Sequence, residues 1–313
     1  MSDSESDSND SPAHCCVSGF RSVLSILYFA LELFVAAFRD FLGQFTRRRK
    51  DVRGQHVVIT GAAQGIGFEM ASKFALDLNA TVAMLDRDQS QLESSVASLR
   101  ERGGDVSAHH CDVTQPEQLK QIAAELNEKK HVDMIIANAG ILQVGRIMDF
   151  NESQIRQVID VNLLGAIWTI RAFLPYMKSM NDGHVVCVSS IAGHYGDTNL
   201  SSYAASKFGI RGFMESLMME LHDDGHSGIK TTTLFPFTTR TKLIKDCTTR
   251  SRLYPILEAH QTADLLIASI LEEREFGFTP TRNGFSPIIG KALLNSHRMR
   301  YVVRRFLGIE FEE

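Results

Sequence analysis

From residue 54 onward the chain alternates short apolar runs with longer segments of helical character. Residues 56–60, 81–85, 106–110, 134–137, 184–189 and 231–234 are predicted strands, and 66–78, 88–102, 114–130, 153–179 and 202–222 are predicted helices. The third of these helices is expected to open with a capping box formed by Thr114 and Glu117. Strands that are continuously apolar and alternate with helices are typical of a parallel sheet covered on both faces. The pattern therefore predicts an α/β fold with a single, doubly wound parallel sheet.

A glycine-rich turn follows the first predicted strand. Gly61, Gly65 and Gly67 lie in the sequence TGAAQGIG, with the spacing GxxxGxG rather than GxGxxG. Glycines allow a tight turn and a close approach of the backbone to a pyrophosphate, and the start of a helix favours an anion. The turn predicts a dinucleotide-binding site, to which Gln64 and Ile66 also contribute.

Polar side chains follow the next three predicted strands. Asp86 ends the second strand, where a carboxylate can accept both ribose hydroxyls of an adenosine and repel a 2′-phosphate, which favours NAD. Arg87 beside it also allows NADP. Asp112 is a candidate partner for the adenine amino group, and Asn138 and Gly140 form a turn that can approach the cofactor. Each of these residues could instead be an ordinary helix cap or turn former.

Tyr203 and Lys207 share one face of a predicted helix, because they are four residues apart. A nearby ammonium lowers the pKa of a phenol, which makes it a usable acid or base toward an alcohol oxygen. Ser190, thirteen residues upstream of Tyr203, can polarise the same oxygen. Asn162 lies in an apolar helical stretch and needs a partner, for which a water that relays protons to Lys207 is a candidate.

Taken in order, these motifs resemble those of the short-chain dehydrogenase/reductases over roughly residues 54–241. The resemblance implies a single Rossmann domain with a seven-stranded parallel sheet. It also implies a nicotinamide cofactor, which is expected to be NAD, with NADP as the alternative. It implies that Tyr203 is the acid/base and that Lys207 lowers its pKa and holds the nicotinamide ribose. Ser190 then positions the substrate oxygen, and Asn162 carries the proton relay. Ser189 is expected to point the other way.

The segment after the sixth predicted strand fits this family less closely. The family's usual Pro-Gly is Pro236-Phe237 here, although Thr239 and Thr241 follow at the spacing where the nicotinamide carboxamide is normally held. The usual Asn-Asn-Ala-Gly also begins with Ala137, which is expected to loosen contacts of the sheet without changing the chemistry.

Composition excludes several other classes of protein. The net charge of −4 gives no basic surface for nucleic acid, and 44% hydrophobic residues exclude global disorder. The five cysteines are odd in number and lack CxxC spacing, which argues against a disulfide scaffold and a zinc site. No metal site is expected.

The ends of the chain differ from its middle. Residues 1–16 are expected to be a disordered acidic tail, 17–46 a membrane anchor that spans the bilayer or lies in its interface, and 47–53 a basic linker. The alternative for the apolar segment is a helix packed on the domain, which itself is expected over 54–285. Residues 286–313 are predicted to form a basic amphipathic element that rests on lipid, or a helix packed on the domain or on a second subunit.

The anchor and several local sequences, including AFLP at 172–175 and SKFG at 206–209, resemble the membrane-associated branch of the family. That branch contains epidermal-type retinol dehydrogenases and lipid-droplet hydroxysteroid dehydrogenases. The resemblance implies an endoplasmic reticulum or lipid-droplet location, a catalytic domain facing the cytosol, and a lipophilic small-molecule substrate. Retinol or retinal is favoured, a hydroxysteroid is the alternative, and a homodimer is possible. A catalytically silent membrane scaffold is a further hypothesis. Residues 254–269 are expected to form helices on the substrate side, where His194 and Tyr195 could also contact substrate.

Overall fold

The computed structural model describes residues 25–35, 38, 42, 48–241, 247–248, 256–280 and 310–311. The predicted acidic tail lies outside the described residues, as does the predicted basic element at 286–313 apart from two residues. The chain divides into two compact units, Met1–Arg48 and Arg49–Glu313.

The first unit contains the helix Ser25–Val35. Its large apolar side chains are exposed, with Phe29 at 60% and Phe34 at 67%. At about 1.5 Å per residue the described helix is about 16 Å long, roughly half of a bilayer's hydrocarbon core. The predicted apolar segment is therefore helical where it is described.

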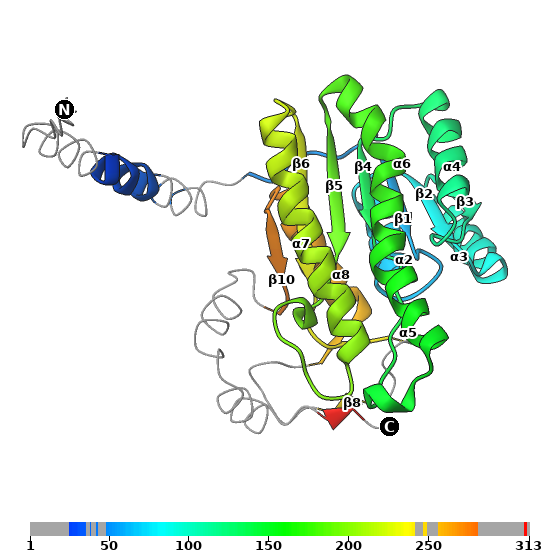
Figure 1. Cartoon of the computed structure of the whole chain (residues 1–313). Helices are drawn as coiled ribbons and strands as arrows, with labels where there is room; N and C mark the ends of the chain where they lie inside the picture. The colour runs from blue at the N-terminus through cyan, green and yellow to red at the C-terminus, as the bar shows by residue number, and fades with distance from the viewer. Residues whose placement is uncertain are drawn as a thin grey trace, which may run out of the picture. The chain divides into compact units, whose positions relative to one another are not determined.

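The second unit is built on a seven-stranded sheet with the order β10-β6-β5-β4-β1-β2-β3 (Figure 1). All neighbouring strands in it are parallel. The strands are β1 (His56–Thr60), β2 (Thr81–Asp86), β3 (Val106–His110), β4 (Met134–Ala137), β5 (Gly183–Val188), β6 (Ile229–Phe235) and β10 (Phe276–Phe278). The doubly wound fold predicted from the alternation is confirmed.

Helices cover both faces of this sheet. The helices of the domain are α2 (Gly65–Ser72), α3 (Gln89–Glu101), α4 (Pro116–Lys129), α5 (Glu152–Ile159), α6 (Gly165–Met180), α7 (Ser201–Asp223) and α8 (Ala259–Leu271). Successive side chains of β1 enter opposite cores: Val57 and Ile59 pack with α2, α3 and α8, whereas Val58 packs with α4, α6 and α7. This alternation explains why the central strands β1 and β4 are buried along their whole length.

Two predicted helices contain π-helical turns. The helix predicted over 66–78 is α2 followed by a π turn at Lys73–Asp77, and the helix predicted over 153–179 is α5, a π turn at Asp160–Leu164, and α6. Together the latter form Glu152–Met180, the one helix among the described residues that is long and apolar enough to cross a membrane. Half of its most apolar window is buried and it packs on the sheet, so it is a core helix of the domain.

The predicted capping box at the start of α4 is wrong. The N-cap is Gln115, and its side chain makes no capping hydrogen bond. Thr114 instead donates its backbone N–H and its hydroxyl to Asp112 Oδ1, at 2.9 and 2.8 Å. The aspartate thus takes the hydroxyl that the capping box would have used.

The expectation of substrate-side helices over 254–269 is also wrong where that segment is described. Its helix is α8, which buries Ala263, Leu266 and Ile270 against the core shared with α2. Around it are short strand pairs: β7 (Thr239–Arg240) pairs with β9 (Leu257–Glu258), and β8 (Cys247–Thr248) pairs with β11 (Glu310–Phe311).

Candidate active site

The glycine turn lies at the carboxyl end of β1, where α2 begins. Gly61 and Gly65 have φ of +65° and +62°, a region that favours glycine. A Cβ on Gly67 would lie 2.1 Å from the carbonyl oxygen of Gly61, so only glycine fits there. The turn therefore brings backbone groups together more closely than side chains would permit.

The start of α2 is suited to bind a phosphate group. Gln64 is its N-cap but makes no side-chain capping bond, and no acidic residue stands in the first turn. The N-terminal N–H groups and the helix dipole thus favour an anion. Ile66, in this first turn, lines the adjoining pocket. Asp86 lies beside the turn, where its Oδ2 accepts the N–H of Ala63 at 3.0 Å. These residues fit a dinucleotide, with the pyrophosphate at the helix and the adenosine ribose toward Asp86.

Asn138 holds the glycine turn in place. Its side-chain amide donates to the carbonyl oxygens of Thr60 and Gly61, at 3.0 and 3.1 Å, and its own N–H donates to the Thr60 hydroxyl. Ala137 is buried in the core. Gly140 follows, and a Cβ there would lie 3.3 Å from Asn162 Oδ1 and 3.7 Å from Lys207 Nζ. The NAG turn therefore links the glycine turn to the catalytic residues.

A second pocket lies outside the carboxyl ends of β2 and β3. Arg87, Asp112 and Arg156 are among its lining residues. Asp112 uses one carboxylate oxygen to bind Thr114, as described above. The pocket combines two guanidinium groups with several carboxylates, and it adjoins Asp86 through Arg87.

Tyr203 and Lys207 lie on α7, and Lys207 Nζ is 5.6 Å from the centre of the Tyr203 ring. The ammonium donates to the carbonyl oxygen of Val188 at 3.0 Å and is buried. Burial lowers the pKa of Lys207 to about 8. Ser189 donates to the carbonyl oxygen of Lys207 and so points away from the pocket, as predicted. Ser190 lines the same pocket as Tyr203.

The expected lowering of the Tyr203 pKa by Lys207 is not what the structure shows. Burial raises the pKa of Tyr203 above its usual value of 10, and the hydrogen bond with Ser190 acts in the opposite direction. The ammonium is bonded to a carbonyl oxygen rather than to the phenol. The phenol therefore starts as a proton donor.

Asn162 lies in the π turn before α6 and is fully buried. Its Oδ1 accepts the N–H of Ile141 at 2.7 Å, while its Nδ2 donates to the carbonyl oxygen of Ile141 and to Ser206 Oγ, at 2.9 and 3.1 Å. The partner that the sequence required is therefore a peptide group and a serine hydroxyl. Both amide hydrogens are used in these bonds. Asn162 thus ties the loop after β4 to α7, the helix that carries Tyr203.

Ser190 and Tyr203 both line one mostly apolar pocket. It is lined by Ile66, Leu142, Ser190, Ile191, Ala192, Tyr195, Asp197, Leu200, Tyr203, Pro236, Phe237, Thr238, Thr239 and Thr241. Sequence reasoning predicted Ile66 and Pro236 but missed other apolar members such as Leu142, Ile191 and Leu200, because an isolated apolar residue in a loop carries no chemical signal. It also missed Ser206, whose part in holding Asn162 no local pattern indicates.

The two threonines predicted near the nicotinamide differ in their surroundings. Thr239 is buried, donates to the carbonyl oxygen of Phe237 at 3.0 Å and lies 2.9 Å from the Thr262 hydroxyl. Thr241 faces the glycine turn, 3.7 Å from the position of a Cβ on Gly65. Pro236 lines the pocket beside them. Thr241 is thus the better placed of the two to meet a cofactor.

His194 does not line this pocket. It is buried, packs edge-on against Phe235 at 4.3 Å between ring centres, and its Nδ1 lies 2.9 Å from a guanidinium nitrogen of Arg211. Tyr195 is the neighbour that reaches the pocket. His194 therefore holds the loop after β5 against α7 and the sheet.

Comparison with known proteins agrees with this site. The family model for short chain dehydrogenases matches residues 55–251. The chain belongs to the short-chain dehydrogenase family. As a member it is an NAD(P)-dependent oxidoreductase that acts on CH–OH groups.

Relatives within the family match most of the chain. Epidermal retinol dehydrogenase 2 of Homo sapiens is 36% identical over 74% of this chain and 76% of its own length. Estradiol 17-beta-dehydrogenase 11 of Macaca fascicularis is 33% identical over 93% of this chain and 96% of its own length.

Solved structures of the family share the fold. A short-chain dehydrogenase/reductase from Burkholderia phymatum in complex with NAD has a TM-score of 0.70 at 24% identity, covering 84% of this chain and 98% of that one. A metagenomic short-chain oxidoreductase in complex with NADP has a TM-score of 0.62 at 26% identity, covering 74% and 99%.

Proposed function

We propose that the protein interconverts a lipophilic alcohol and its carbonyl compound, with retinol and retinal as the substrate pair. The observation that carries this proposal is the mostly apolar pocket that both Ser190 and Tyr203 line. An apolar lining favours a hydrocarbon body, and the hydroxyl groups of Ser190 and Tyr203 in it can bind an alcohol or carbonyl oxygen. The similarity to epidermal retinol dehydrogenase 2 supports the retinoid.

The proposed chemistry is proton transfer by Tyr203 to or from the substrate oxygen. When bound, the nicotinamide supplies or accepts the hydride. The raised pKa keeps Tyr203 protonated, so that a proton is available for a carbonyl oxygen, and in the oxidative direction its phenolate accepts the proton of the alcohol. Ser190 holds the same oxygen by a hydrogen bond. Lys207, held by the carbonyl oxygen of Val188, places a positive charge beside the phenol and is suited to hold the nicotinamide ribose.

Asn162 and the turn after β4 are proposed to hold the catalytic residues in position without contacting the substrate. Asn162 is 44 residues from Ser206 in the chain, yet its bond to that hydroxyl fixes the loop at Ile141 relative to α7. In this proposal the asparagine acts as a positioning residue, and a proton relay through it would use the remaining acceptor capacity of its Oδ1.

We propose NAD as the preferred cofactor, with NADP accepted less well. Asp86 lies next to the glycine turn, where its carboxylate favours ribose hydroxyls and disfavours a 2′-phosphate. Arg87 and Arg156 line the neighbouring pocket and supply positive charge that can offset part of this repulsion. Asp112, in the same pocket, is the proposed partner of the adenine amino group.

A hydroxysteroid is the second candidate substrate. Relatives named estradiol 17-beta-dehydrogenase 11 and 17-beta-hydroxysteroid dehydrogenase 13 match 92 to 93% of this chain, which is more than the 74% matched by the human retinol dehydrogenase. The apolar pocket is compatible with a rigid steroid as well as with a polyene.

We propose that the N-terminal helix anchors the protein to the endoplasmic reticulum membrane or to a lipid droplet, with the catalytic domain facing the cytosol. The exposed apolar side chains of Ser25–Val35 support this, as does the basic run of residues 47–50 that follows. Replacing Leu31 and Phe34 with aspartate is expected to move the protein from the carbonate-washed membrane or droplet fraction to the supernatant. A variant that stays bound would contradict the anchor.

Self-association as a homodimer is a further proposal. Met148 and Met219 are 88% and 55% exposed on the domain surface, and an interface between two copies would cover side chains of this kind. Light scattering of the detergent-solubilised protein distinguishes a dimer from a monomer.

The decisive experiment measures reduction of NAD and of NADP by detergent-solubilised protein. The substrates are all-trans-retinol, a 17β-hydroxysteroid and a long-chain alcohol, each with Tyr203→Phe and, as a matched control, Tyr176→Phe on α6. We expect Tyr203→Phe to lower kcat by about 10²- to 10⁴-fold, the usual contribution of acid–base catalysis, and Tyr176→Phe to leave it unchanged. Cofactor binding without turnover of any substrate would favour the membrane scaffold instead.

A further inference from the structure

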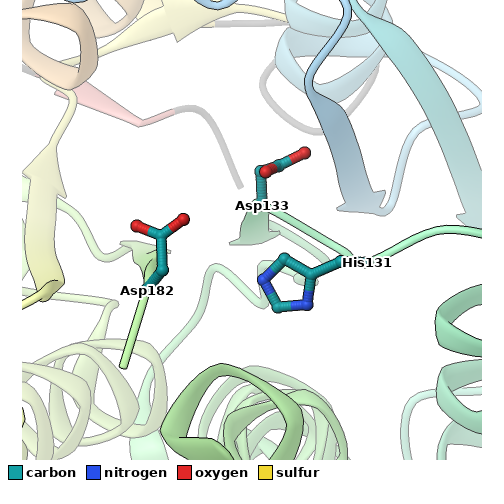
Figure 2. A group of neighbouring side chains, drawn as sticks. All are labelled: His131, Asp133 and Asp182. Carbon is teal, nitrogen blue, oxygen red and sulfur yellow. The ribbon is translucent and has the colours of Figure 1, made fainter. Parts of the chain in front are cut away.

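A histidine and two aspartates lie close together at the amino ends of two central strands, whereas the catalytic residues lie at the carboxyl ends. His131 and Asp133 come just before β4, and Asp182 comes just before β5, its parallel neighbour. One ligand atom from each lies within 4.8 Å of the other two. Figure 2 shows one ring nitrogen of His131 turned toward the side on which Asp182 lies, with Asp133 above the ring.

One ring nitrogen of His131 lacks a hydrogen-bond partner in the described part of the chain. His131 Nε2 is buried and makes no hydrogen bond to any described residue. Buried polar atoms in native proteins nearly always have a partner, and one that has none indicates an ordered water or an ion. This nitrogen is therefore a second observation, independent of the carboxylates, that points to a ligand.

The two carboxylates retain capacity for a cation. Asp133 accepts the N–H of His56 with Oδ2 at 2.7 Å, which leaves its other oxygen available. Asp133 and Asp182 also attract the ammonium of Lys50 electrostatically. That ammonium, however, bonds to His184 Nδ1 at 2.9 Å and forms an ion pair with Glu273 at 3.8 Å. Asp182 is exposed, so an ion can reach it from solvent. Carboxylates thus outnumber the ammonium in this corner.

We propose that His131, Asp133 and Asp182 bind a divalent transition-metal ion of the zinc class. An imidazole nitrogen with two carboxylate oxygens suits zinc better than calcium or magnesium, which take oxygen ligands. With metal–ligand bonds of about 2.0 to 2.2 Å, each side chain moves inward by roughly half an ångström, and water completes the coordination. The exposed side chain of Asp182 has the freedom to make this movement.

The ion joins the starts of two adjacent strands. Asp133 is next to Met134, and Asp182 next to Gly183, and Met134 pairs with His184 in the sheet. A metal there links segments about 50 residues apart in the chain, which stabilises the folded state without contact with the catalytic groups. The proposal departs from the expectation of no metal site, which rested on the spacing of the cysteines.

The test is a titration of chelator-treated, full-length protein with zinc alone. Calorimetry measures the binding, in a buffer that does not bind metal. We expect one equivalent of zinc to bind, and both His131→Ala and Asp182→Asn to weaken its affinity at least tenfold. The matched control is His222→Ala, which removes an exposed histidine that also neighbours two aspartates in sequence. Calcium is expected not to compete.

Thermal unfolding supplies a second readout. Zinc is expected to raise the midpoint of the wild type and of His222→Ala, and to leave that of Asp182→Asn unchanged. Because Asp182 is exposed, we expect Asp182→Asn to fold normally. The proposal can therefore be tested with Asp182→Asn even if His131→Ala folds poorly. Equal zinc affinity in the wild type and Asp182→Asn, or no saturable binding by the wild type, would overturn the proposal.

Discussion

At the carboxyl ends of the strands, Ser190 and Tyr203 line a pocket. At the amino ends, Lys50 and His184 instead form a hydrogen bond with each other. His184 is fully engaged: Nδ1 meets Lys50 and Nε2 meets Thr232 Oγ1 at 2.8 Å. In the pocket, the hydroxyls of Ser190 and Tyr203 face space that a substrate can enter.

The same type of side chain, a buried lysine, has a proposed catalytic role at the carboxyl ends of the strands and a structural role at their amino ends. Lys207 and Lys50 both have a pKa lowered by burial. The first lies beside a phenol, and the second holds the segment that leads from the N-terminal unit into the domain: the N–H of Lys50 donates to Leu271, and Val52 lies in the core. Ligands of open α/β sheets bind at the carboxyl ends, which leaves the amino ends for structural contacts. Substitutions at matched positions test this division.

The largest difference is expected for glycines. Gly67→Ala forces a Cβ to within 2.1 Å of the Gly61 carbonyl oxygen, so the cofactor turn must move. We expect NAD affinity, measured by fluorescence titration, to fall more than 100-fold, equivalent to about 3 kcal/mol. At the other end Gly54→Ala meets no atom within 4 Å, so it bears only the strain of its φ of +68°, about 1 kcal/mol. Equal NAD affinity in the two variants would contradict the division.

Two asparagines provide a second matched pair. Asn162 makes three hydrogen bonds at the carboxyl end, while Asn127 joins the carbonyl oxygen of Ala123 to the N–H of Val132 at the amino end. We expect Asn162→Ala to lower the free energy of unfolding by about 3 kcal/mol and Asn127→Ala by about 1 kcal/mol, because the first leaves buried groups unpaired. Urea unfolding measures both. Only Asn162→Ala is expected to lower kcat as well.

Acid is expected to weaken the amino end. Burial holds the pKa of His184 well below 6.5, so its imidazole is neutral when folded. Below pH 6.5 the imidazole of His184 binds a proton in the unfolded chain but not in the folded one. The free energy of unfolding therefore decreases as the pH is lowered, by up to about 1.4 kcal/mol per pH unit. Urea titrations at pH 7, 6 and 5 are expected to show a smaller slope in His184→Asn. His56 and His109, whose pKa values are also lowered by burial, account for what slope is left.

The smallest expected effect is a shift of the pH profile at the carboxyl end. The hydrogen bond from Ser190 lowers the pKa of Tyr203, so Ser190→Ala raises that pKa further. Because alcohol oxidation needs the phenolate, its rate rises with pH toward this pKa, and the rise is expected to move to higher pH by about one unit or less. The profile of kcat/KM for oxidation measures the shift. A shift to lower pH would show that the hydrogen bond stabilises the neutral phenol.

Local patterns were sufficient to predict the order and type of the elements. The strands at His56–Thr60, Val106–His110 and Met134–Ala137 have the predicted bounds, and the first and last of them are mainly apolar runs between turn residues. The start of α4 was mispredicted, because Asp112 competes for the Thr114 hydroxyl. Helix α8 was assigned to the substrate side, because a sequence gives the period of an apolar face but not the surface on which it packs.

The parallel α/β fold, the glycine turn and the i, i+4 pair of Tyr203 and Lys207 could all be predicted from local sequence, since each depends on residues close together in the chain. The three-dimensional structure was needed to show that Asn162 binds Ile141 and Ser206, that burial raises the pKa of Tyr203, and that His131 lies close to Asp182. These contacts depend on the order β5-β4-β1 of the sheet and on how deeply each group is buried. Both are properties of the packed core as a whole, which no spacing within a short segment encodes.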